Sequence, residues 1–128
     1  MLDAAALAAR GAFVEHRGVR MLVVDATDLR EFDDFSAMIG RFESLIRGEP
    51  EHSVRVVMLV AGLHFDRKSV GAIKGVFVRV QPWIRASCLV GVSGLQKVLL
   101  QVLNQVAKRE RPLFNTLEQA KDWLATQV

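Results

Sequence analysis

The stretch from Leu89 to Leu100, LVGVSGLQKVLL, holds residue types that could perform chemistry. An apolar run ends in Gly-Val-Ser-Gly and leads into a segment with helical spacing. A serine on a tight strand-to-helix turn is typical of hydrolases with a G-x-S-x-G motif, and a glycine-rich turn there can hold a phosphate. Position 95 is leucine, so the hydrolase motif is incomplete, and Lys97 does not stand at the phosphate-loop spacing. Neither enzymatic motif is present.

Two interpretations of this turn remain. Ser93 and Gln96 form the S-x-x-Q pattern of a capping box, in which each side chain satisfies a backbone N–H at a helix start. The N–H groups of the same helix start could instead attract an anion, with Lys97 one turn into the helix. The possible anion-binding residues are therefore Ser93, Gly94 and Lys97.

A second strand-to-helix loop lies at 59–70, with the sequence LVAGLHFDRKSV. Asp66 stands where a helix cap is expected, because aspartate readily accepts a hydrogen bond from a backbone N–H in the first turn. The loop could also be a functional surface, and the residue pattern alone leaves both interpretations open.

The other reactive side chains predict no metal or catalytic site. His16, His52 and His64 have no spacing that metal ligation would require. Cys88, the single cysteine, lies in an apolar run without a basic neighbour, which indicates a buried, unreactive thiol. Asp25 and Asp28 could belong to the acidic Mg²⁺ site of a receiver domain. Such a domain also needs a phosphorylatable aspartate after the matching later strand, and here that strand ends in MLVAGL without an acid. We expect no enzyme activity and no cofactor.

Composition indicates one ordinary domain. The chain has 128 residues, 51% of them hydrophobic, and a net charge of +3. The first 64 residues carry seven Arg against ten acids, and the rest carry ten Lys or Arg against four acids, so the halves are −3 and +6. The cations are scattered without interleaved aromatics, which argues against nucleic-acid binding. No apolar run approaches the roughly 20 residues that span a bilayer, and we expect a cytoplasmic protein.

Hydrophobic periodicity predicts an α/β fold. Near-continuous apolar strands are expected at 12–16, 19–25, 53–63 and 84–92, and a short one at 112–114. Helical spacing is expected at 33–48, 66–81, 95–109 and 115–127. The first two strands form an antiparallel hairpin and the remainder alternate with helices, so the sheet is mixed. Residues 1–11 are expected as an N-terminal extension, exposed or forming a helical turn, and 12–128 as a single domain.

The pattern resembles a STAS-type domain, the fold of bacterial anti-sigma-factor antagonists. The stretches VVMLVAGLHFDRKSVGAI, CLVGVSGLQKVLLQVL and LFNTLEQAKDWL carry the likeness, which covers roughly residues 12–127. The likeness is strongest to small stand-alone STAS-like proteins of unassigned role. The resemblance implies a mixed sheet with helices packed against it, and a regulatory module that binds another protein and signals without catalysis.

This sequence departs from the family at the phosphorylated turn. Members that act as phospho-switches carry Asp-Ser-Ser-Gly there, and one serine takes phosphate from a partner kinase. The matching residues are Asp66, Arg67, Lys68 and Ser69. The resemblance therefore implies a partner-binding turn whose phosphoryl control is lost or has moved to Ser69. Its expected partner-binding residues are Gly62, His64, Asp66, Arg67, Lys68 and Ser69.

Two further interactions are open. The predicted helix at 95–109 is apolar over a wide arc, which a buried helix or a homodimer contact would explain. Some STAS-like chains resemble lipid-carrying CRAL-TRIO domains in sheet arrangement, so a bound small molecule is the alternative function.

Overall fold

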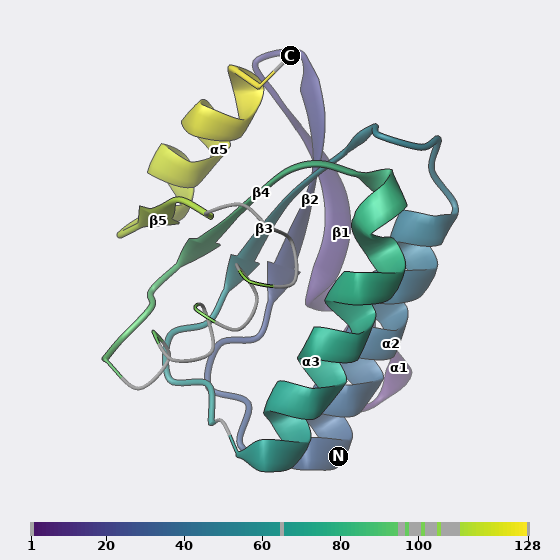
Figure 1. Cartoon of the computed structure of the whole chain (residues 1–128), viewed down its shortest axis with the longest axis vertical. Coiled ribbons are helices and arrows are strands. Elements are labelled where there is room, and N and C mark those ends of the chain that lie inside the picture. The colour runs from purple at the N-terminus through teal and green to yellow at the C-terminus, as the bar shows by residue number, and fades with distance from the viewer. Residues whose placement is uncertain are drawn as a thin grey trace.

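The computed structural model describes residues 2–64, 66–94, 97, 101, 105 and 111–127. Its centre is a five-stranded sheet in the order β1-β2-β3-β4-β5 (Figure 1). The first two strands pair antiparallel and each later pair is parallel, which confirms the predicted mixed sheet. The strands are β1 (Gly11–His16), β2 (Val19–Asp25), β3 (Val54–Leu59), β4 (Ile84–Val90) and β5 (Leu113–Phe114).

A two-residue turn closes the hairpin. Arg17 and Gly18 both have positive φ, 54° and 76°, as a type I′ turn requires. This turn sets the register, with His16 opposite Val19 and Phe13 opposite Leu22. Phe13 therefore faces one layer of helices, while His16 faces the other side of the sheet.

Helices α2 (Phe32–Arg47) and α3 (Arg67–Val80) cover one face of the sheet and lie side by side (Figure 1). Their inward side chains join those of β2 and β3 in the larger core, where Phe42 and Phe77 meet with ring centroids 6.0 Å apart. The helix predicted to stop at Pro82 ends at Val80 and continues as one turn of 3₁₀ helix, η1 (Gln81–Trp83). Proline lacks the N–H that an α-helix would use there.

The opposite face carries α5 (Leu117–Ala125), which packs on β3 and β4. Thr116 caps this helix by accepting a hydrogen bond from the Gln119 N–H. At the hairpin turn, His16 Nε2 and Asp122 Oδ1 are 2.7 Å apart, and this contact holds the pKa of Asp122 below its ordinary value. The pair links α5 to the turn between β1 and β2.

The N-terminal segment forms α1 (Ala4–Ala9), capped by Asp3. Leu2 and Leu7 pack against the larger core, so the segment is attached to the domain. At its end, Arg10 Nη1 donates to the carbonyls of Asp25 and Thr27, at 3.1 and 2.9 Å.

The helix predicted at 95–109 is described at three positions only. Lys97, Gln101 and Gln105 are helical and exposed. The apolar arc proposed for a buried or homodimer contact lies outside the described residues: Leu95, Val98, Leu99, Val102, Leu103 and Val106.

Candidate functional site

The loops after β2, β3 and β4 meet at one edge of the sheet, because parallel strands end on the same side. The Asp28 N–H donates to the Ala61 carbonyl at 2.9 Å, and the His64 N–H donates to the Leu29 carbonyl at 2.9 Å. These two bonds join the loop before α2 to the loop before α3. The predicted partner-binding turn is therefore held in place by a second loop.

Two glycines allow this close approach. Gly62 has φ +70°, and a Cβ at this position would collide with Oδ1 of Asp28. Gly91 has φ +85°, and a Cβ there would lie 3.0 Å from the Ala61 Cβ. Only glycine adopts positive φ without strain and leaves this space for a neighbouring chain.

Asp66 caps α3, as predicted. Its Oδ1 accepts hydrogen bonds from the Ser69 backbone N–H at 2.9 Å and from Ser69 Oγ at 3.1 Å. The Ser69 N–H is the main cause that lowers the pKa of Asp66, and the Ser69 hydroxyl adds to it. Ser69 is only 2% exposed, so a kinase could reach its hydroxyl only after the first turn of α3 opens. This burial favours loss of phosphoryl control over its transfer to Ser69.

Acid titration tests this cap. A carboxylate with a lowered pKa contributes stability above its unfolded pKa, near 3.8, and loses it as pH falls through the folded value. We expect Asp66→Ala to lower the thermal midpoint by a few degrees at pH 7, with the difference from wild type vanishing below pH 3.8. Asp66→Asn, which keeps a neutral cap acceptor, is the control and should differ less at pH 7. An undiminished Asp66→Ala difference in acid would contradict the cap.

Arg67 and Lys68 project from the first turn of α3. Both are exposed, and neither forms an ion pair with any residue that the structure describes. Lys68 Nζ lies 5.8 Å from the Phe32 ring centroid, which places its ammonium beside the start of α2. Lys74 is a third exposed cation along the same helix. These three side chains form what we call the α3 cation patch.

The far end of α3 is electrically balanced. Arg79 donates to both carboxylate oxygens of Glu43 on α2, at 2.9 and 3.0 Å. This contact is the main cause that lowers the pKa of Glu43. Unmatched positive charge on α3 is therefore concentrated between Arg67 and Lys74.

The predicted anion-binding residues Ser93, Gly94 and Lys97 are exposed beside this edge. The Lys97 N–H donates to the carbonyls of Ser93 and Gly94, at 3.1 and 3.3 Å. Gln96, the second member of the predicted capping box, lies outside the described residues. The structure therefore leaves the capping box and the anion site as predictions.

The described part of the chain offers neither a metal-ligand cluster nor a reactive cysteine. No group of three His, Cys, Asp or Glu side chains there could hold a metal ion. Cys88 is buried on β4, and burial raises the pKa of its thiol to about 12. At neutral pH this thiol is protonated and a poor nucleophile.

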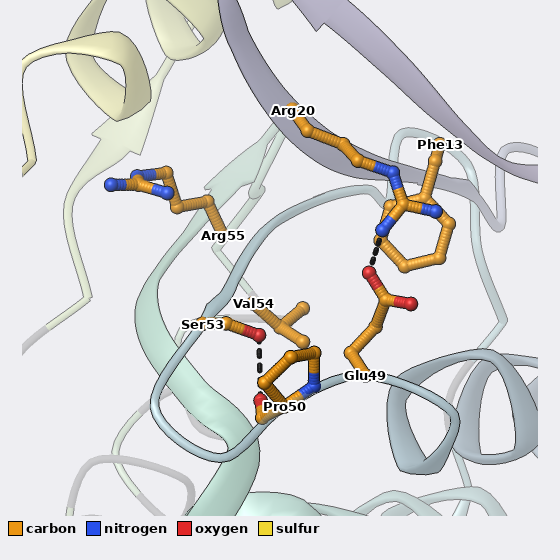
Figure 2. Close-up of a pocket in the computed structure, with 7 residues that line it drawn as sticks. All are labelled: Phe13, Arg20, Glu49, Pro50, Ser53, Val54 and Arg55. Atoms are coloured by element: carbon orange, nitrogen blue, oxygen red, sulfur yellow. Dashed lines mark hydrogen bonds and ion pairs between the residues drawn. The ribbon is translucent and has the colours of Figure 1, made fainter.

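Two of the hollows among the described residues adjoin β1. One, of about 290 Å³, is on the α5 face between β1, β2 and α5, with apolar walls that include Val14, Val23 and Leu117. The other, of about 180 Å³, is lined by Phe13, Arg20 and the loop after α2 (Figure 2). Both are smaller than the roughly 300–1,000 Å³ of drug-sized ligand sites.

Sequence reasoning missed a buried arginine behind the candidate site. Arg111 belongs to the charged run KRERP at residues 108–112. It is nevertheless only 4% exposed, and its guanidinium carbon lies 4.7 Å from the Phe77 ring centroid. Phe77 lies on the inward side of α3, but nothing in the local sequence links it to position 111.

Comparison with known proteins supports the fold alone. No protein-family model and no curated protein matches the sequence. Among solved structures, the chain is similar to an uncharacterised protein of the DUF3478 family with a SpoIIAA-like fold, from Shewanella loihica PV-4. The TM-score is 0.71 at 16% sequence identity, and the match covers 89% of this chain and 91% of the other.

The match confirms the predicted STAS-like fold. Among the described helices, none is long and apolar enough to cross a membrane. The chain has a SpoIIAA-like, that is STAS-like, fold with an edge of loops that presents the α3 cation patch.

Proposed function

We propose that this protein is a non-catalytic regulatory module that binds an acidic surface on another protein. The contact is made by the turn at 62–69 together with the α3 cation patch. The observation that carries the proposal is the pair of exposed cations, Arg67 and Lys68, beside a turn whose described residues are held by backbone hydrogen bonds on both sides. The Asp66 cap and the loop-to-loop hydrogen bonds support the turn.

Local helix energetics do not explain these cations. The first turn of a helix has positive backbone character, so Arg67 and Lys68 are unfavourable there by a few tenths of a kcal/mol each. Residues placed against local preference often serve an interaction. A turn that is ordered before binding also loses little entropy when a partner docks. The arrangement suits an anionic partner.

The proposed binding does not depend on phosphorylation of this turn. The two positions that match the family's serines are Arg67 and Lys68, neither of which is a serine that could accept phosphate. Ser69 is buried and donates to Asp66. Any switching would then belong to the partner or to another segment.

Neutralising the cations tests the proposal. We expect Arg67→Ser/Lys68→Ser to weaken partner binding about tenfold, and raised salt to weaken wild-type binding in the same direction. The control is Arg47→Ser/Arg85→Ser, which removes the same amount of charge. Arg47 is the last residue of α2 and Arg85 lies at the start of β4, so both are at the end of the sheet away from the candidate edge. Affinity capture from a lysate with quantitative mass spectrometry, followed by titration of each captured protein, measures the effect. Equal partner recovery by both double variants would overturn the proposal.

Small-molecule binding is the second candidate, supported by the hollow of about 290 Å³ on the α5 face. Its charged lining residues are Arg10, Asp25 and Lys121, and both cations are paired with acids, so an occupant would be small and largely apolar. The hollow is below the usual size for such sites, which places this function second. A native mass spectrum of the purified protein would show a retained ligand.

A further inference from the structure

The two edges of the sheet differ in how they are protected. β5 has two residues, Leu113 and Phe114, while β1 at the other edge has six. Very short edge strands resist pairing with other chains, whereas long ones offer rows of unpaired N–H and C=O groups. No proline or lysine interrupts β1, whose sequence is GAFVEH. β1 is therefore the edge available for strand addition.

The hairpin register shows which backbone groups point outward. His16 and Val19 flank a two-residue turn and bond to each other, so the bonded pairs alternate from there. The N–H and C=O of Phe13 and Glu15 then face away from β2. Gly11 also faces outward, but its carbonyl accepts a hydrogen bond from Arg41 Nη2 at 3.2 Å. The open part of the edge is thus 12–16.

Val14 is the centre of this open part. It is 37% exposed and is one of three exposed large apolar side chains among the described residues, with Val78 and Leu113. Its side chain and that of Ala12 are on the α5 side of the sheet, where they line the hollow described above. A strand paired here would cover them.

Charges on the other side of β1 are arranged for self-pairing. Glu15 is exposed and makes no ion pair with a described residue. Arg20 lies directly opposite Glu15 on β2, but its guanidinium lies over the Phe13 ring at 3.8 Å and contacts Glu49 (Figure 2). Arg41 stands beside Gly11, and its buried Nε donates no hydrogen bond. The Glu15 carboxylate therefore has no ion pair among the described residues, while the guanidinium groups of Arg20 and Arg41 lie beside Phe13 and Gly11.

We propose that β1 pairs antiparallel with β1 of a second copy of this chain, about a two-fold axis at Val14. This register places Phe13 opposite Glu15 of the second copy and forms four backbone hydrogen bonds. Each Glu15 then stands between Arg20 and Arg41 of the other copy. Opposite-charge pairs across strands stabilise a sheet, and like charges destabilise it. The result is a continuous ten-stranded sheet across the dimer.

The first test reverses the charge. We expect wild type to form a dimer whose fraction rises with concentration, and Glu15→Lys to raise the dissociation constant about tenfold or more. Glu31→Lys makes the same charge change at the start of α2, away from β1, and should dimerise as wild type does. Light scattering during size exclusion gives the masses, and thermal melts confirm that each variant is folded. A wild type that stays monomeric at millimolar concentration would overturn the proposal.

The second test reads the register. Directly opposed residues of a non-bonded antiparallel pair have Cα atoms about 4.5 Å apart, within the range a disulfide can bridge. Val14→Cys should therefore oxidise readily to a covalent dimer. Val78→Cys, at a more exposed site on α3 (52%), is the control and should not, and buried Cys88 does not interfere. Equal rates of dimer formation at both positions would overturn the interface. Neither test involves Arg67 or Lys68, so it stands apart from the proposed function.

Discussion

Replacement of Phe77 by alanine should lower the free energy of unfolding by about 3–5 kcal/mol, as for other large-to-small changes of buried aromatics. Phe77 is 2% exposed and lies where α2, α3 and the sheet meet. Its ring contacts Phe42, and the Arg111 guanidinium lies over it at 4.7 Å. Alanine would leave a cavity and remove the aromatic surface under a buried cation. Both losses act on α3, the helix that carries the cation patch.

Urea unfolding followed by tryptophan fluorescence measures the loss of unfolding free energy, with one tryptophan on each face of the sheet. Trp83 packs against the larger core and Trp123 against the smaller one. Val78→Ala, on the solvent side of the same helical turn, is the matched control and should change stability by about 0.5 kcal/mol or less. A loss below about 1 kcal/mol for Phe77→Ala would show that the Phe77 contacts are not those of a close-packed core.

The main strands and helices could be predicted because each has a local hydrophobic pattern, continuous in the buried strands and periodic in the helices. β2, β3 and β4 are nearly continuous apolar runs, and α2 buries Phe35, Met38, Ile39, Phe42 and Ile46 at helical spacing. β5 was expected from the three residues Pro-Leu-Phe and has two. Its place at the sheet edge depends on pairing with β4, far away in sequence, which a local pattern does not encode.

The candidate site was predictable in its local part only. The Asp66 cap follows from one residue at a helix start, and the structure has it. Two features depend on how α3 and the loop that holds Asp28 pack together. These are the burial of Ser69 and the close approach of Asp28 to Gly62, which leaves no room for a Cβ. Arg111 is similar, because its environment is supplied by Phe77 of a different helix. Contacts between segments distant in sequence determine the surroundings of Gly62, Ser69 and Arg111. Hydrophobic periodicity is a local pattern and does not predict such contacts.

Gly91 makes the second large prediction, at the turn after β4. Alanine there would adopt φ +85° and place its Cβ 3.0 Å from the Ala61 Cβ and 3.2 Å from the Ala61 nitrogen. A left-handed conformation costs an L-residue roughly 1–2 kcal/mol, and the Ala61 backbone must also move. We expect Gly91→Ala to lower the free energy of unfolding by about 2–3 kcal/mol.

The Gly91 change should also affect the candidate edge, since Ala61 accepts the hydrogen bond from Asp28 that joins the two loops. Gly94→Ala is the matched control three residues later, because a Cβ there meets nothing within 4 Å. Urea unfolding gives the stability of both variants, and amide exchange of Asp28 and His64 reports the loop contacts. Faster exchange at these amides in Gly91→Ala alone would show that the turn after β4 supports the partner-binding turn. Equal stability and equal exchange in both variants would mean that the three loops are ordered independently.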